Sequence, residues 1–180
     1  GTKVERVEKT EGKVILHLDS KKSLEADVAL IAIGREMNLD RLGLDKAGVE
    51  LASPSQIAVD EHMETNVKGI YAVGDIASKW WLAHVGTHQG LVAADNACGI
   101  PTQMHYEAIP NVIFTHPEIA SVGISLEEAK KQEFAAKSAQ FPFKALGKSE
   151  ASGDTEGFCE IIIDEKTGRI LGAEVIGNQA

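Results

Sequence analysis

Cysteine and long apolar runs are scarce in this sequence, and each shortage excludes a class of protein. The two cysteines, Cys98 and Cys159, lie far apart and form no Cys-x-x-Cys pair. We therefore predict buried free thiols rather than a disulfide, which fits a reducing, cytoplasmic compartment. No apolar run approaches the roughly 20 residues that a membrane-spanning helix needs. No signal-peptide pattern opens the chain.

Positive charge is also in short supply. The 18 lysines and arginines face 27 acidic residues, which gives a formal net charge of −9. A surface of this sign disfavours nucleic acid and anionic membranes as partners. What remains is the composition of an ordinary globular protein, with 43% hydrophobic and 25% charged residues in 180 residues. That length suffices for one domain or two small ones.

A short apolar run followed by Gly74 and Asp75 is the most informative local pattern. Residues Ile70 to Val73 are typical of a buried strand, and Asp75 would then lie at its carboxyl end, where open α/β sheets bind ligands. A carboxylate there accepts hydrogen bonds from the hydroxyls of a sugar-like ligand, and Gly74 leaves room for close approach. The alternative is a turn Asp that caps the next helix. The spacing alone does not choose between them.

A helix rich in small residues is predicted over 85–98, because Gly86, Gly90 and several alanines recur there and Gly99 and Pro101 follow. It begins beside Leu82-Ala83-His84. Its N-terminus carries free backbone N–H groups and partial positive charge. His84 and His88 have the spacing of a metal pair, but no third ligand accompanies them, so we predict no metal.

The remaining pattern predicts alternating strands, turns and short helices. The expected elements are a hairpin over 4–9 and 13–18, a strand over 28–33 covered on both faces, a helix-and-turn over 38–51, a strand over 57–60, an edge strand over 112–114, a capped helix from Ser125 to about Phe134, a strand starting at Phe141, a loop over 145–153 and a hairpin over 158–163 and 170–176.

Several of these motifs resemble the pyridine-nucleotide disulfide oxidoreductases. The stretch from Thr65 to Asp75 is similar to the second flavin-binding motif of that family. Ala32-Ile33-Gly34-Arg35 resembles its turn beside NAD. The run from Pro110 to Gly123 resembles the start of its interface domain. Leu82-Ala83-His84 is closer to the lipoamide dehydrogenase branch than to glutathione reductase.

The resemblance implies roles for particular residues. Asp75, next to Gly74, would bind the ribityl hydroxyls of FAD. Leu82-Ala83-His84 would face the edge of the isoalloxazine ring. Ala32, Gly34 and Arg35, together with Val4, would face NAD. No catalytic residue and no metal ligand is assigned to this chain.

The implied fold class is α/β and α+β. It has the tail of an NAD-binding domain over 1–35, a central FAD-contacting domain over 36–104 and an interface domain with an antiparallel sheet over 105–180. The last would form a homodimer. The parent enzyme would oxidise dihydrolipoamide, pass electrons through a disulfide and FAD to NAD, and serve a 2-oxo acid dehydrogenase complex.

Parts of the family's chemistry have no counterpart in the sequence. The Gly-x-Gly-x-x-Gly loop, the redox Cys-x4-Cys pair and the His-Pro segment with the acid–base histidine are not found. We therefore expect a piece of the family chain that is inactive by itself. Two alternatives remain: another flavoprotein disulfide reductase, such as a glutathione, trypanothione or mercuric reductase, or a non-catalytic dimerisation module.

Overall fold

The computed structural model describes all 180 residues, and the chain divides into two compact units. The first is Gly1–Glu36 and the second is Met37–Ala180. Each is described by itself. No helix in either unit combines the length and the apolar content that a membrane span requires.

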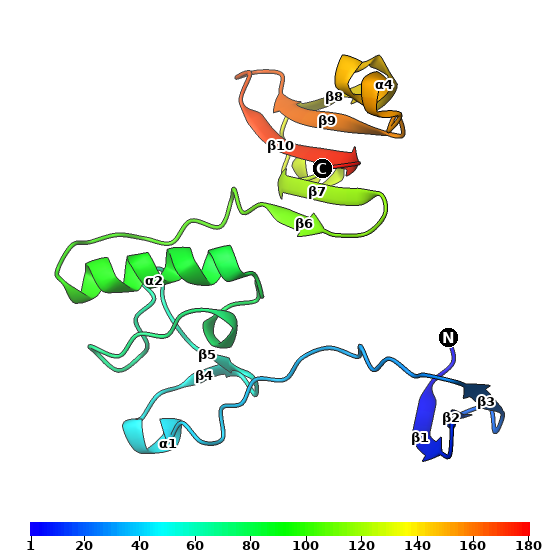
Figure 1. Cartoon of the computed structure of the whole chain (residues 1–180). Helices are drawn as coiled ribbons and strands as arrows, with labels where there is room; N and C mark the ends of the chain where they lie inside the picture. Colours follow the sequence, from blue (N-terminus) through cyan, green and yellow to red (C-terminus); the bar gives the residue numbers. More distant parts are fainter. The chain divides into compact units, whose positions relative to one another are not determined.

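The first unit is a small antiparallel sheet. Strands β1 (Val4–Thr10), β2 (Lys13–Leu18) and β3 (Ser23–Ala26) lie in the order β1-β2-β3. Gly12 joins the first two with a φ of 80°, a conformation that glycine adopts without strain. The predicted hairpin is confirmed, and β3 extends it by one strand (Figure 1).

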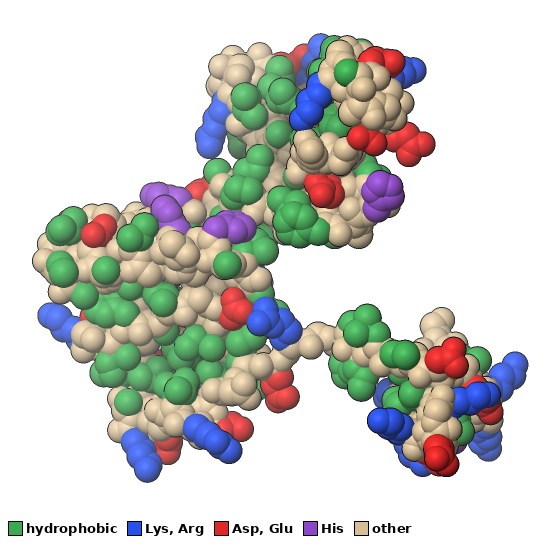
Figure 2. All heavy atoms as spheres, viewed as in Figure 1, with side chains coloured by type: hydrophobic (Ala, Val, Ile, Leu, Met, Phe, Trp, Pro, Cys, Tyr) green, Lys and Arg blue, Asp and Glu red, His purple; other side chains and the backbone are tan.

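The predicted buried strand over 28–33 is wrong. This segment forms no strand, and Val28, Leu30, Ile31 and Ile33 are 81%, 90%, 69% and 94% exposed. A strand needs a neighbour for its N–H and C=O groups and cover for its side chains. No segment of this chain provides either, so the apolar run lies extended with its side chains uncovered (Figure 2).

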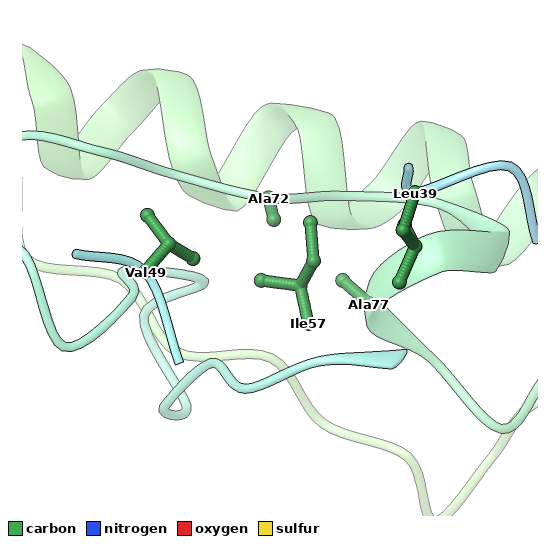
Figure 3. Close-up of a cluster of buried hydrophobic side chains, with 5 residues drawn as sticks. All are labelled: Leu39, Val49, Ile57, Ala72 and Ala77. Carbon is green, nitrogen blue, oxygen red and sulfur yellow. The ribbon is translucent and has the colours of Figure 1, made fainter. Parts of the chain in front are cut away.

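The central part of the second unit packs short elements around a core of five buried residues. It contains α1 (Leu44–Ala47), β4 (Leu51–Ser53) and β5 (Gln56–Ile57), followed by the 3-10 turn η1 (Asp75–Ala77). The core residues are Leu39, Val49, Ile57, Ala72 and Ala77 (Figure 3). The helix-and-turn prediction over 38–51 is confirmed, but β5 ends at Ile57, short of the strand predicted to Asp60.

The helix α2 (Ala83–Ala97) confirms the prediction for 85–98 and begins two residues earlier. Its buried side carries Val85, Val92 and Ala93, which pack with Met63 and Met104 in a second core. The strand predicted over 70–73 is wrong, because only an isolated bridge joins Tyr71 to Glu64. A longer ladder needs a neighbouring strand for the N–H and C=O groups of this stretch, and none of the three sheets includes it.

The last third of the chain is a five-stranded antiparallel sheet. Its strands are β6 (Asn111–Ile113), β7 (Glu118–Gly123), β8 (Ala136–Pro142), β9 (Gly157–Asp164) and β10 (Ile170–Gly177), in the order β6-β7-β10-β9-β8 (Figure 1). The predicted edge strand and the β9–β10 hairpin are confirmed. Helix α3 (Leu126–Lys131) starts with the predicted capping box of Ser125 and Glu128.

Two local predictions in this sheet domain are wrong. Strand β8 ends at Pro142 instead of beginning near Phe141. The polar stretch predicted as a loop over 145–153 holds α4 (Gly147–Ser152), preceded by the 3-10 turn η2 (Phe143–Ala145). The thiols are free as predicted, but Cys98 is exposed rather than buried, because it follows the last turn of α2. The mixed α/β and α+β class is confirmed.

Candidate functional site

The turn at Gly74 and Asp75 is the centre of the candidate site. Gly74 has φ 81° and ψ −157°, a combination that a side chain would strain. Asp75 then begins η1 and is half-buried. Ala72 before the turn and Ala77 after it are both buried in the first core, so the turn is anchored on both sides. Asp75 is thus not sealed inside a core.

A buried glutamine, which the sequence analysis did not single out, holds this turn against α2. The Gly74 N–H donates to Oε1 of Gln89 at 2.8 Å. Nε2 of Gln89 donates to the hydroxyl of Tyr106, also at 2.8 Å. Gln89 is fully buried, at 0% exposure. The available signal was its position on the apolar side of the predicted helix, between Val85 and Val92.

A second contact between α2 and the turn depends on the absence of a side chain. A Cβ built on Gly86 would lie 3.2 Å from the Cα of Gly74. Gly86 and Gln89 are three apart, so they share one face of the helix. Because Gly86 has no side chain, the Gly74-Asp75 turn lies directly against α2.

Tyr71, three residues before Gly74, keeps its phenol protonated. Burial of its hydroxyl raises the pKa of Tyr71, and the nearby carboxylates of Glu64 and Asp60 act in the same direction. A neutral phenol at this position adds no charge to the turn that carries Asp75.

The first turn of α2 has backbone N–H groups that no side chain caps and that no acidic residue neutralises. Leu82 precedes the helix in an extended conformation, no side chain caps it, and no acidic residue lies in the first turn. The N–H groups of Val85 and Gly86 bond to the Leu82 carbonyl at 3.0 and 3.1 Å. The earlier N–H groups and the positive end of the helix dipole therefore favour an electronegative ligand edge at Ala83, which is exposed.

The imidazole of His84 forms a hydrogen bond with the backbone. Its Nε2 donates to the carbonyl of Pro110 at 2.8 Å, which ties the start of α2 to the segment before β6. His84, His88 and His105 line a pocket of about 430 Å³. Figure 2 shows histidine side chains gathered over the part of the molecule that contains α2. No group of three potential ligands has a geometry that would hold a metal ion.

The residues expected to face NAD lie in the other unit. Val4 is at the start of β1 and is 42% exposed. Ala32, Gly34 and Arg35 lie in the exposed extended segment, where Gly34 has a φ of 116°. The structure thus brings Gly74, Asp75, Leu82, Ala83 and His84 together around α2, and places the other four in Gly1–Glu36.

Comparison with known proteins finds two family matches along the chain. Residues 1–90 match the profile of pyridine nucleotide-disulphide oxidoreductases, and residues 109–180 match the dimerisation domain of the same family. The chain belongs to this family. It is accordingly built on a disulfide oxidoreductase framework, with the dimerisation-domain sheet formed by β6 to β10.

Named relatives of this chain are dihydrolipoyl dehydrogenases. That of Chlamydia pneumoniae is 55% identical over 156 residues, covering 87% of this chain and 34% of that protein. That of Geobacillus stearothermophilus is 40% identical over 159 residues, covering 88% and 34% respectively. The chain therefore spans about a third of the length of the curated relatives that it matches.

Solved structures of family members show the same fold. The crystal structure of LpdA from Mycobacterium tuberculosis has a TM-score of 0.91 at 28% identity, over 98% of this chain and 39% of that one. The Cu(II) complex of the HOCl-induced flavoprotein disulfide reductase RclA from Escherichia coli has a TM-score of 0.86 at 25% identity, over 98% and 41%.

Proposed function

We propose that this chain supplies the flavin-contacting and dimer-forming part of a dihydrolipoyl dehydrogenase. The observation that carries the proposal is the Gly74-Asp75 turn, packed on α2 beside that helix's uncapped start. Sequence similarity to enzymes named dihydrolipoyl dehydrogenase supports the choice within the family. The domain division is proposed with it: the tail of an NAD-binding domain over 1–35, a central domain over 36–104 and an interface domain over 105–180.

The residues around α2 fit FAD by chemistry. The half-buried carboxylate of Asp75 accepts hydrogen bonds from ribityl hydroxyls, and the missing Cβ of Gly74 leaves the backbone open to a bulky ligand. The N-terminal N–H groups of α2 at Leu82-Ala83-His84 favour negative charge at the ring edge. Bound flavin supplies two-electron transfer between a dithiol and NAD. The residues of this chain orient the flavin and tune its electrostatics. None of them is proposed as catalytic.

NAD and protein partners complete the proposal. Ala32, Gly34, Arg35 and Val4 contribute to the NAD side, where Gly34 leaves its backbone open. The sheet domain over 105–180 forms a homodimer, as its match to a dimerisation domain supports. The whole enzyme would serve a 2-oxo acid dehydrogenase complex in the cytoplasm. The chain alone has neither the redox cysteine pair nor the acid–base histidine, so we expect no turnover of dihydrolipoamide by it.

A flavin titration of the purified chain tests this function. We expect FAD fluorescence to be quenched saturably by the wild-type chain, and the Kd to rise at least about tenfold in Asp75→Asn, because charged hydrogen bonds are the strongest polar contacts at such a site. Asp95→Asn, near the other end of α2, is the matched control and should leave the Kd unchanged. Equal affinity of Asp75→Asn and wild type, or no binding by either, would contradict the proposal.

Two other functions have specific discriminators. Another disulfide reductase of the family is favoured by the fold similarity to RclA, and turnover of glutathione or Hg²⁺ rather than dihydrolipoamide by the whole enzyme would select it. A non-catalytic dimerisation module is favoured by the β6–β10 domain, and predicts a stable dimer that binds no flavin. Light scattering combined with the flavin titration separates this case.

A further inference from the structure

The amide of Gln89 is the one fully buried polar side chain on α2, and both of its ends are bonded. A buried amide is costly unless it is hydrogen-bonded, so a side chain at 0% exposure with two partners at 2.8 Å is held in one orientation. Because Oε1 accepts from Gly74 and Nε2 donates to Tyr106, a flipped amide would face a donor with a donor at the Gly74 end.

The bond at Gly74 restrains the backbone directly before Asp75. Gly74 is the residue with φ 81° that directly precedes Asp75, and glycine is otherwise free to rotate there. The bond to Gln89 fixes the Val73–Gly74 peptide, and the Gly74 carbonyl accepts from the Ala77 N–H at 3.0 Å. The residue that leads into Asp75 is therefore held on both sides. Gly86 supports the same placement from one turn earlier, since its Cβ position lies 3.2 Å from Gly74.

The other end of the amide reaches a different part of the chain. Tyr106 lies between α2 and β6, and its hydroxyl donates in turn toward Sδ of Met63 at 4.0 Å. The network therefore runs from the Gly74 turn through α2 to the segment that leads into the sheet domain.

We propose that Gln89 is a positioning residue for the candidate flavin site, which sets the direction of Asp75 through Gly74 and is itself oriented by Tyr106. The proposal rests on the proposed function in one respect, that Asp75 binds the flavin. It assigns no chemistry to Gln89 itself, which acts through Asp75.

The test is a double-mutant cycle read by flavin affinity. Gln89→Leu should raise the Kd for FAD about three- to tenfold in the wild-type background. In the Asp75→Asn background it should raise the Kd less than about twofold, because the residue through which Gln89 acts is already disabled. Full additivity of the two changes would overturn the proposal. Gln140→Leu, an exposed glutamine on β8, is the matched control and should leave the Kd unchanged.

A readout that needs no flavin separates this proposal from the function on which it rests. The Gly74 amide proton should exchange about tenfold faster in Gln89→Leu, while the amide of Val92 in the core keeps its rate. An unchanged Gly74 rate would overturn the positioning role even if FAD binds. Faster exchange in a chain that binds no FAD would uphold the positioning and refute the flavin function.

Tyr106→Phe keeps the test decisive if Gln89→Leu does not fold. It leaves the Gly74–Gln89 bond in place but removes the partner that orients the amide. We expect an increase of about two- to fivefold in both the Gly74 amide exchange rate and the Kd for FAD. Wild-type values for both would contradict the role given to this network.

Discussion

At the scale of single residues, the candidate ligand-facing residues Gly74 and Asp75 lie on a turn that the buried amide of Gln89 holds. Asp75 and Gly74 were found because a glycine and an acid follow an apolar run. Gln89 was not, because a glutamine on the apolar side of a predicted helix does not reveal its hydrogen-bond partners. Its importance appears only when Gly74 and Tyr106, 15 and 17 residues away, meet its two amide atoms.

The close approach of α2 to the turn makes Gly86 a sensitive position. Gly86→Ala gains helix propensity of about 1 kcal/mol, but the added methyl lies 3.2 Å from the Gly74 Cα and must displace the turn. We expect flavin affinity to fall several-fold with little change in Tm, measured by titration and thermal unfolding. Gly90→Ala has open space around it and should raise Tm without affecting flavin. Equal behaviour of the two variants would refute the contact.

At the scale of elements, two helices with clear end signals were predicted, whereas α4 was missed and two predicted strands are absent. The helix α2 and the capping box of α3 depend on signals within a few residues, such as Gly99 beyond one helix and Glu128 within the other. The strands predicted over 28–33 and 70–73 did not form. A strand is completed by hydrogen bonds to a neighbour, and an apolar run does not say whether that neighbour is present in the chain.

The turn between β9 and β10 depends on one buried carboxylate. The hydroxyl of Thr167 donates to Oδ2 of Asp164 at 2.6 Å, and this bond, against the effect of burial, lowers the pKa of Asp164. The folded state therefore favours the ionised form. Its stabilising contribution is complete above the ordinary Asp pKa of about 4 and is lost as the pH falls through the lowered value.

Asp164→Asn should remove that pH dependence. Between about pH 7 and about pH 3, the Tm of the wild type should fall more steeply than that of the variant, because only the wild type must protonate a hydrogen-bonded carboxylate. Glu165→Gln, at the exposed neighbour that pairs with Lys137, is the control and should keep the wild-type slope. Parallel slopes for Asp164→Asn and wild type would show that Thr167 does not stabilise the carboxylate.

At the scale of the whole molecule, the uncovered apolar run over 28–33 should govern solution behaviour. Ile31 and Ile33 are 69% and 94% exposed and belong to no helix or strand. We expect the chain to bind a hydrophobic dye and to self-associate as its concentration rises. The double variant Ile31→Ser with Ile33→Ser should show less dye binding, measured by fluorescence, and less self-association, measured by light scattering. Its Tm should not fall.

A matched pair of exposed changes controls this experiment. Lys21→Ser with Lys22→Ser alters two exposed side chains in the same unit but removes no large apolar surface. Dye binding should then stay at the wild-type level. A monodisperse wild-type chain that binds no dye would contradict the expectation outright.

The sequence by itself determined the family, the hairpins and the presence of a helix over most of α2. These depend on residues close together in the chain or on motifs that can be recognised in order. It also determined the positions of the candidate ligand-facing groups, Asp75 and Leu82-Ala83-His84. Only the tertiary structure decided that Gln89 and Gly86 hold the turn, and that the run over 28–33 has no cover. Contacts between distant segments set hydrogen bonding and burial, and a local pattern does not contain them.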